Sequence, residues 1–461
     1  MRVFLLNTPE EGKLVSRDMA GGLGFDRTER MALPPLDLLG YGTVLVEHGH
    51  EVRILDPQVE PVTPAQALEE VTAFKPDAVV LTMSLPTLST DSAFAANLRR
   101  AVAPGCRIVL KTGVRHPPAL EAALRRSGVD FVLTGEGDLI IAELLSGKSR
   151  EGTAWLEEGA LREAPETLLA DLDRLPILRR SLVPSHLYRY PRLGDGVATF
   201  QTSRGCPFSC GYYCPYPLVQ GKKWRAMSAE RVVRELKHLC EVDGLSKVFF
   251  RDATFTLDKQ RATSICEGIL ELGLELTWWC ETRVDCLTEP LLELMSRAGC
   301  VGINIGVETG DDVMIRERAR KNVGVQQVTA LSRFCKKLGL KLHFLLLIGL
   351  PGETRASLLE TLRLVDQLEP ESLGVTTATP YPGTPMHEDA VREGWIVEPD
   401  LETFGGHGFN MDVGVSARDL ATALERIHEM GRLGSRRDPE AAERKRAIYR
   451  ELSDWAPQEV V

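Results

Sequence analysis

Long apolar runs are missing from this sequence of 461 residues. The longest, 344–350, is far too short to cross a bilayer, which takes about 20 residues in a helix. Polar residues follow the apolar start at 1–6 at once, so the pattern lacks the apolar segment of a secretory signal. These absences predict a cytoplasmic protein with no membrane partner.

An excess of positive charge is also missing. Lys and Arg number 55 against 65 Asp and Glu, which gives a net charge of −10. A nucleic-acid groove needs clustered cations, so we expect no nucleic-acid partner and favour a cationic or neutral small substrate. The ten cysteines are scattered apart from one tight group, which indicates a reducing compartment and not a disulfide framework.

The first part of the chain alternates short β-rich runs with helical stretches. Strands are predicted at 3–6, 52–55, 78–82, 107–111 and 131–134. This pattern predicts an α/β fold over 1–147, a doubly wound, Rossmann-like parallel sheet with helices on both faces. Ligands of such sheets bind beyond the carboxyl ends of the strands, where this region carries Ser84, Gly113, Gly135, Glu136 and Gly137.

A second βα series follows a proline-punctuated stretch, 148–194, that we predict to be a linker. Its strands are expected at 198–201, 248–250, 277–280, 302–307, 342–347 and 374–377, with helices such as 229–240, 289–297 and 326–338 between them. Six βα units within 195–399 predict a partial (β/α)6 barrel of the TIM type. Polar helices at 417–432 and 439–452 predict a C-terminal helical cap over 400–461.

The tight cysteine group directly follows the first strand of this second series. Cys206, Cys210 and Cys214 are spaced C-x-x-x-C-x-x-x-C, and each is followed by Pro or Gly. Helix interiors reject Pro and Gly, so a ligand loop is favoured over buried structural cysteines on a helix face. Three thiolates on a loop can ligate three irons of a 4Fe-4S cluster and leave the fourth iron open. Zinc is the alternative metal, although no fourth Cys or His stands at nearby spacing.

These cysteines and the motifs behind them resemble the radical S-adenosylmethionine (SAM) superfamily over 197–385. The superfamily's usual spacing is C-x-x-x-C-x-x-C, so the last gap is one residue longer here. The resemblance implies a 4Fe-4S cluster on the three cysteines and SAM on the open iron. It also implies an α/β barrel whose strand ends bind SAM.

The same resemblance implies a role for each matching residue. Tyr213, before the last cysteine, would face the SAM adenine, and Asp252 would complement the methionyl ammonium group. Glu308 would bind a ribose hydroxyl or the amino acid portion, and Gly349 in the run Gly-Leu-Pro-Gly would border the adenine. The alternative is that the two carboxylates form structural ion pairs and that the glycine run is a simple turn. Further candidates for SAM or substrate, with surface charge as the alternative, are Arg225, Glu281 and Arg283.

The first domain resembles the cobalamin-binding domains that precede many radical SAM enzymes. The D-x-H-x-x-G motif of that family, whose histidine ligates cobalt, does not occur in this sequence, and His48 and His50 flank Gly49 before a strand. We therefore expect cobalamin to be absent and the domain to contribute to the substrate cleft.

The cysteine spacing together with this domain resembles the radical SAM 1,2-diol dehydratases of aminoglycoside antibiotic biosynthesis. The resemblance implies a lyase that dehydrates paromamine to 4'-oxolividamine after hydrogen abstraction at C4', the first step of C3'-deoxygenation. Tyr216 is the expected general acid, with Tyr212 and Tyr381 as alternatives. The expected partners are an aminoglycoside substrate, an external electron donor and a separate NADPH-dependent reductase. The ammonium groups of the substrate would meet Glu136, Asp138 and Glu281.

Two other functions stay open. A cobalamin-dependent radical SAM methyltransferase would share these parts but would hold a corrinoid and transfer a methyl group. A non-enzymatic protein would use the cluster as a redox or structural element and would not cleave SAM.

Overall fold

The computed structural model describes residues 1–9, 15–17, 25–26, 31–433 and 438–455. The chain forms two compact units. The first comprises Met1–Pro207, Pro215–Ala253 and Gly273–Thr277, and the second comprises Phe208–Cys214, Thr254–Leu272 and Trp278–Val461. The first unit therefore continues past residues 147 and 194, where the sequence suggested domain boundaries, because strands of the second βα series make contacts within it.

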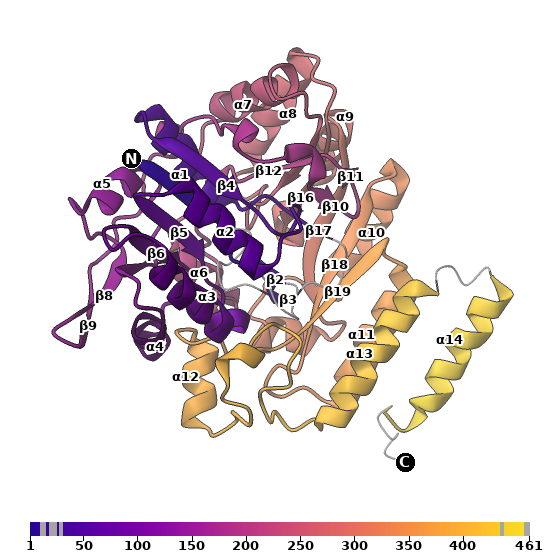
Figure 1. Ribbon diagram of the computed structural model, residues 1–461. Helices are drawn as coiled ribbons and strands as arrows, with labels where there is room; N and C mark the ends of the chain where they lie inside the picture. The colour runs from indigo at the N-terminus through magenta and orange to yellow at the C-terminus, as the bar shows by residue number, and fades with distance from the viewer. Residues whose placement is uncertain (10–14, 18–24, 27–30, 434–437, 456–461) are drawn as a thin grey trace. The chain divides into compact units, whose positions relative to one another are not determined.

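A seven-stranded sheet in the order β4-β1-β5-β6-β7-β8-β9 forms the core of the amino-terminal region (Figure 1). Its first five strands are parallel, and their order confirms the doubly wound fold. The winding reverses between the neighbouring strands β1 and β5, which is the point where such sheets bind ligands. The strand bounds are β1 Arg2–Leu6, β4 Glu51–Leu55, β5 Ala78–Thr82, β6 Arg107–Lys111 and β7 Phe131–Leu133.

Helices cover both faces of this sheet because its strands are apolar on both sides. Val3 and Leu5 of β1 belong to one buried cluster with α1 (Leu36–Glu47) and α5 (Ile141–Ser146). Phe4, between them, points the other way and meets Phe74 of α2 edge-on, with ring centroids 5.5 Å apart. The remaining bounds are α2 Pro64–Phe74, α3 Leu88–Ala101 and α4 Pro117–Ser127.

The stretch 148–194 is more than a linker. It contains β8 (Thr153–Glu157) and β9 (Ala160–Glu163), an antiparallel hairpin that extends the sheet beyond β7. Glu158 and Gly159 form its two-residue turn, with φ of 51° and 79°. Positive φ at both central residues is the geometry that matches the twist of paired strands.

The second βα series supplies six strands that follow one another in chain order, β12-β15-β16-β17-β18-β19, as in half of a βα barrel. Within the first unit, β12 and β15 pair in parallel, and within the second, β16 to β19 do the same. The strand bounds are β12 Val197–Phe200, β15 Lys247–Phe250, β16 Thr277–Thr282, β17 Cys300–Glu308, β18 Lys341–Ile348 and β19 Ser372–Thr377. The intervening helices are α7 Ala229–Glu241, α8 Lys259–Glu271, α9 Glu289–Arg297, α10 Val325–Leu338 and α11 Arg355–Leu368.

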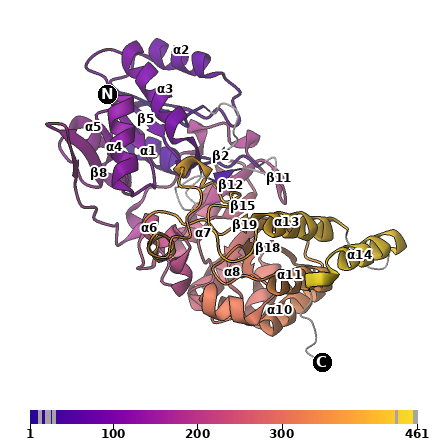
Figure 2. The ribbon, with the colours of Figure 1, turned by 90° about the horizontal axis from the view of Figure 1, so that it is seen from below.

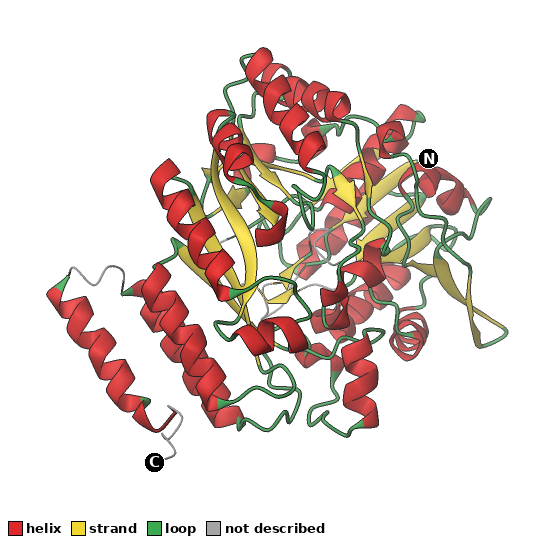
Figure 3. Cartoon of the chain, turned by 180° about the vertical axis from the view of Figure 1, so that it is seen from behind, coloured by secondary structure: helices red, strands yellow, loops and turns green. Residues whose placement is uncertain are grey.

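The second unit ends in helices α12 (Pro385–Arg392), α13 (Ala417–Arg432) and α14 (Pro439–Glu451), of which α13 lies against α11 (Figures 2 and 3). Lys445 of α14 is buried and pairs with Asp366 of α11 at 3.1 Å. The two helices expected beyond residue 400 are thus present. In the described part of the chain, no helix is both long and apolar enough to cross a membrane.

Candidate functional site

The cysteine loop begins at a short antiparallel ladder between β13 (Ser203–Arg204) and β14 (Arg225–Ala226). Gly205 follows with φ of 84°, and a Cβ there would collide with the carbonyl oxygen of Lys223, so only glycine fits. The buried Cys206 comes next, and its amide donates to the carbonyl of Gly221 at 3.1 Å. The backbone that presents the first cysteine is therefore fixed on both sides.

The other two cysteines lie on a single 3-10 turn, η6 (Ser209–Tyr212), and the residues just after it. Cys210 is buried, Cys214 is half-buried, and the amide of Cys214 donates to the carbonyl of Cys210 at 3.1 Å. The segment is not an α-helix, in agreement with the Pro and Gly residues that interrupt it.

Cations surround Cys210. The guanidinium of Arg283 donates to its Sγ at 3.7 Å and stacks over the ring of Phe208, with 3.9 Å to the centroid. Asp285 holds that guanidinium with hydrogen bonds of 2.7 and 2.9 Å. Burial raises the pKa of the Cys210 thiol, whereas the charges of Lys321 and Arg283 act to lower it. Such cations stabilise the thiolate form in which cysteine binds a metal.

The donor set fits an iron-sulfur cluster by its chemistry. Three soft thiol ligands within nine consecutive positions suit a 4Fe-4S cluster with one open iron, whereas structural zinc takes four. Cys206 belongs to the first unit and the other two to the second. Among the described residues, no three His, Cys, Asp or Glu side chains are already gathered around one point. The ligand assignment therefore rests on the residue types and their spacing.

Asp252, just past β15, is completely buried and holds the backbone segment that leads into the cysteine loop. Its carboxylate accepts hydrogen bonds from the hydroxyl of Thr202 at 2.9 Å, from the amide of Thr202 at 3.3 Å and from the hydroxyl of Ser203. These donors immediately precede Arg204 and the loop. The role of Asp252 toward the SAM amino group stays a prediction.

Two buried side chains, Glu308 and Lys321, meet the half-buried Tyr213 at the end of β17. Glu308 has φ of 69°, and the register of β17 with β18 shifts just before it. Lys321 forms an ion pair with its carboxylate and donates to the carbonyl of Gly306 at 2.8 Å. Burial and the hydrogen-bonded Glu308 carboxylate hold the pKa of Tyr213 well above its usual value. Tyr213 and Glu308 were both expected at the SAM site, whereas no motif pointed to Lys321.

The Gly-Leu-Pro-Gly turn after β18 encloses a second buried carboxylate. Gly349, with φ of 82°, donates its amide to Glu353 at 3.3 Å, and the hydroxyl of Ser357 donates to the same carboxylate. Burial raises the pKa of Glu353 to about 7. Glu281, another expected site residue, lies on β16 and accepts from the amide nitrogen of Asn304 at 3.0 Å.

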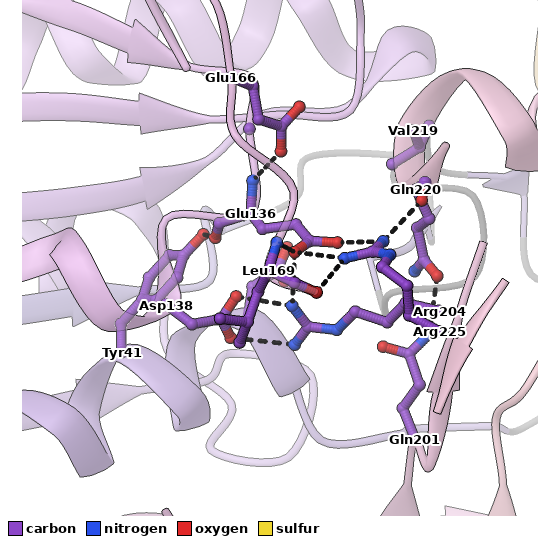
Figure 4. A network of polar contacts seen from close by, with 12 residues as sticks. Tyr41, Glu136, Asp138, Glu166, Leu169, Gln201, Arg204, Val219, Gln220 and Arg225 are labelled. Carbon is purple, nitrogen blue, oxygen red and sulfur yellow. Dashed lines mark hydrogen bonds and ion pairs between the residues drawn. The ribbon is translucent and has the colours of Figure 1, made fainter. Parts of the chain in front are cut away.

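Arginines on both sides of the cysteine loop are paired with carboxylates of the β7–α5 loop (Figure 4). Arg225 donates to Glu136 at 2.6 and 3.0 Å, and Arg204 donates to Asp138 at 2.7 and 3.0 Å. All four side chains are buried in the first unit. Glu136 and Asp138, expected to meet substrate ammonium groups, are thus engaged by arginines, and Arg225, expected at SAM or substrate, is engaged by Glu136. Sequence reasoning missed Arg204.

The three tyrosines considered as proton donors differ in their surroundings. Tyr216 opens helix α6 (Tyr216–Gln220), is buried, and accepts a hydrogen bond from Gln201 at 2.9 Å. Tyr212 donates to Asp389 at 3.0 Å, and burial raises its pKa to about 12. Tyr381 is half-buried in the loop after β19.

A polar pocket opens at the carboxyl ends of β5 and β6, where ligand-binding residues were expected. Thr82, Ser84 and Gly113 line it together with Lys111, whose ammonium donates to the carbonyl of Gly135 at 2.8 Å. Asp37, at the start of α1, lies 3.6 Å from Lys111, and burial raises the pKa of its carboxyl. None of the described residues that line this pocket is a histidine.

Comparison with known proteins identifies the family of the second βα series. Residues 200–365 match the radical SAM superfamily. The chain is 32% identical to an uncharacterized methyltransferase of Pyrococcus horikoshii over 86% of its own length and 84% of the relative's. It is 24% identical to the cytidylyl-2-hydroxyethylphosphonate methyltransferase of Streptomyces wedmorensis, over 78% of both chains. It is 27% identical to the hopanoid C-3 methylase of Methylococcus capsulatus, over 77% of this chain and 68% of the relative.

Two solved structures share the fold. One is the radical SAM methyltransferase TsrM of Kitasatospora setae with cobalamin and a [4Fe-4S] cluster bound, with a TM-score of 0.67 and 20% identity over 85% of this chain and 75% of that one. The other is the cobalamin-dependent radical SAM enzyme OxsB with aqua-cobalamin bound, with a TM-score of 0.69 and 16% identity over 92% of this chain and 66% of that one.

These relatives correct two predictions. The expected dehydration of paromamine is contradicted, because the relatives are methyltransferases and a methylase. The expected absence of cobalamin is contradicted by the two solved structures, which share the fold and hold cobalamin. The lyase and aminoglycoside assignments fall with the first correction, and so does the reason for making Tyr216 a general acid. The extent of the similarity establishes the family: this chain belongs to the radical SAM superfamily.

Proposed function

We propose that this chain is a cobalamin-dependent radical SAM methyltransferase. The observation that carries the proposal lies in the first unit. There, buried ion pairs join the doubly wound sheet, a fold that binds ligands at its strand ends, to the base of the cysteine loop. The names of the relatives support methyl transfer. Those relatives carry names for different substrates, so the substrate of this chain is left open.

Each part of the chain has a task in this proposal. Cys206, Cys210 and Cys214 hold the cluster, and the cation of Arg283 stabilises the sulfur of Cys210. When bound, SAM supplies the methyl group, cobalamin carries it, and the cluster supplies single electrons that come from an external donor. Tyr213 and Glu308 are the candidates for holding SAM.

The pocket at the carboxyl ends of β5 and β6 is the candidate cobalamin site. The hydroxyl groups of Thr82 and Ser84 and the ammonium of Lys111 are of the type that binds the amides and phosphate of a corrinoid. They are now bonded to Asn7, Thr87 and the carbonyl of Gly135, respectively, and would exchange these partners for the corrinoid. Since the sequence lacks the D-x-H-x-x-G motif and no described lining residue is histidine, these groups would hold the corrinoid without a histidine bond to cobalt.

The test uses anaerobically purified protein with a reconstituted cluster. Hydroxocobalamin is added, unbound corrinoid is removed, and cobalt and iron are measured per chain. A reductant and SAM with a deuterated methyl group follow, and S-adenosylhomocysteine is quantified by mass spectrometry. We expect stoichiometric cobalt and S-adenosylhomocysteine that forms only with cobalamin bound. Failure to retain cobalamin, or SAM cleavage that never yields S-adenosylhomocysteine, would contradict the proposal.

A matched variant tests the candidate cobalamin site. Lys111→Met removes an ammonium group from the wall of the pocket, where it is bonded to the carbonyl of Gly135, and keeps most of the side chain's volume. We expect lower cobalt retention with unchanged iron content. A surface variant, Lys148→Met, serves as the control because this lysine is exposed outside the pocket.

A further inference from the structure

A second pocket in the first unit is lined mainly by apolar side chains. Every residue that lines it belongs to this unit. Its apolar wall comes from α1, the stretch 175–178, β12 and the segment before α7, and includes Leu36, Val44, Leu175, Leu178, Phe200 and Met227. We call this hollow the apolar pocket. Sites for small molecules are of this kind, concave and mostly apolar with a few polar groups that fix the orientation of the ligand.

Helix α1 contributes to the apolar pocket and to the candidate cobalamin site with different faces. Leu36, Gly40 and Val44 are spaced by four positions, so they follow one another along one face of the helix, and all three line the apolar pocket. Asp37 and Leu38 point in other directions and line the polar pocket. The two pockets share no lining residue, and the apolar pocket is therefore a separate site.

Two buried oxygens in the wall of the apolar pocket lack a hydrogen-bond donor. The amide nitrogen of Gln201 donates to the hydroxyl of Tyr216 at 2.9 Å and to the side chain of Gln220 at 3.1 Å (Figure 4), whereas its Oε1 has no partner among the described residues. Glu235 accepts from Arg231 at 2.6 Å through Oε2, and its Oε1 is likewise without a partner in the described part of the chain.

These two oxygens point to a donor from outside the chain. Gln201 is 8% exposed and Glu235 is 3% exposed, and both line the pocket. A buried polar atom without a partner costs free energy, and most such atoms in folded proteins are therefore bonded. Because both atoms are acceptors, the group that satisfies them carries O–H or N–H.

The charges in the wall of the apolar pocket favour an uncharged occupant. Its two carboxylates, Asp138 and Glu235, are already paired with Arg204 and Arg231 at 2.7 and 2.6 Å. A cation that entered the pocket would lose its hydration without gaining a free counter-charge. An anion would meet two acceptor oxygens and no free donor.

We propose that the apolar pocket binds a compact, uncharged small molecule with an apolar body and a hydroxyl or N–H group. The body packs against the apolar wall, and the donor group bonds to the free oxygens of Gln201 and Glu235. The proposal does not depend on the methyltransferase function. Since Gln201 also bonds to Tyr216 and Gln220 of α6, which follows Cys214, the occupant contacts a side chain that supports the segment after the cysteine loop.

The test uses three soluble probes with the same six-membered carbon ring: cyclohexanol, cyclohexanone and cyclohexylammonium. The first offers a neutral donor, the second only an acceptor, and the third a cation. Binding to the anaerobically reconstituted protein is titrated by ligand-observed NMR, and competition with cyclohexanol identifies probes that share its site. Val44→Phe fills the pocket from α1, and Val46→Phe is the matched control, because Val46 lies on the same helix but does not line the pocket.

We expect cyclohexanol to bind the wild type at least about fivefold more tightly than cyclohexanone, whose carbonyl leaves the two oxygens without a donor. Cyclohexylammonium should not displace cyclohexanol. Val44→Phe should weaken cyclohexanol binding about tenfold or more, and Val46→Phe should leave it near wild type. Gln201→Met keeps the volume and removes one acceptor, so it should reduce the preference for the alcohol severalfold. The preference of the wild type tests the proposal even if Val44→Phe fails to fold.

Three results would overturn the proposal. Absence of saturable cyclohexanol binding to the wild type would mean that ordered water alone satisfies the two oxygens. Equal affinities for the alcohol and the ketone would remove the donor from the argument. An equal loss of binding in the two phenylalanine variants would place the bound alcohol outside the apolar pocket.

Discussion

The guanidinium of Arg204 and the carboxylate of Asp138 form a two-pronged ion pair, with hydrogen bonds of 2.7 and 3.0 Å, although 66 positions separate them in the chain. Both side chains are less than one-tenth exposed. Removing Asp138 would leave the buried Arg204 with Glu136, at 3.4 Å and already shared with Arg225, as its remaining counter-charge. This pair is therefore a strong point at which to test what holds the first unit together.

Asp138→Asn should lower the free energy of unfolding by about 3–5 kcal/mol, measured by urea denaturation. The control is Asp195→Asn, which removes the partner of Arg189 from an ion pair whose side chains are 44% and 67% exposed, and should cost no more than about 1 kcal/mol. Replacing both partners, Asp138→Leu with Arg204→Met, should recover much of the loss. Equal, small effects for Asp138 and Asp195 would contradict a structural role of the buried pair.

Each of the substitutions Cys206→Ala, Cys210→Ala and Cys214→Ala should abolish the cluster, because three protein ligands are the minimum for this type of site. Iron and sulfide content and the visible absorbance of the reconstituted protein measure the result. Cys240→Ala is the control, since Cys240 is half-buried on α7, outside the cysteine loop. Full iron content in any of the three loop variants would remove that cysteine from the ligand set.

Glu353 should make stability fall as pH rises. Its pKa is about 7 in the folded chain, against an ordinary value of 4.5, so the folded state binds more protons than the unfolded state between these values. Stability should decrease by up to about 3 kcal/mol as pH rises from 4.5 to 7, and level off above. Glu353→Gln cannot ionise and should lack this decrease. Identical pH profiles for wild type and variant would show that the buried carboxyl does not titrate there.

Asp252→Asn separates two roles of the carboxylate. If it only holds Thr202 and Ser203, the variant should lose about 1–3 kcal/mol of stability, and SAM binding should weaken in proportion to the lost fold. If it also binds the SAM ammonium group, SAM affinity measured on the folded fraction should drop as well. Thermal unfolding and equilibrium binding of SAM to the reconstituted protein provide the two readouts, and Thr202→Val provides a control that removes one donor and keeps the charge.

Regular patterns predicted most of the architecture. The strands that the sequence indicated are present in both sheets because parallel, buried strands read as short apolar runs between helical stretches. The β8–β9 hairpin was not predicted because only two of its nine strand residues are buried and they show no clear alternation. Its signal was local, the Glu158-Gly159 pair, which permits the positive φ values of a tight turn.

The site was only partly predictable, because residues that pair across long stretches of sequence do not stand at any characteristic spacing. The cysteines could be found because their chemistry is local. The partners of Arg204 and Arg225 could not, because each pair joins segments 66 and 89 positions apart. Lys321, the partner of Glu308, is near in the chain but stands in no recognisable motif. The reaction was misjudged for a further reason: radical SAM proteins with the same parts differ in outcome, and the outcome depends on bound cofactor and substrate, not on the spacing of three cysteines.

The ion pairs of Figure 4 also limit how this protein can change over evolutionary time. Whatever the amino-terminal sheet binds, the β7–α5 loop would still be needed, because without Glu136 and Asp138 two guanidiniums would be buried without counter-charges. Loss of the amino-terminal sheet would therefore require replacement of Arg204 and Arg225 as well, whereas loss of a ligand from that sheet would leave these ion pairs in place.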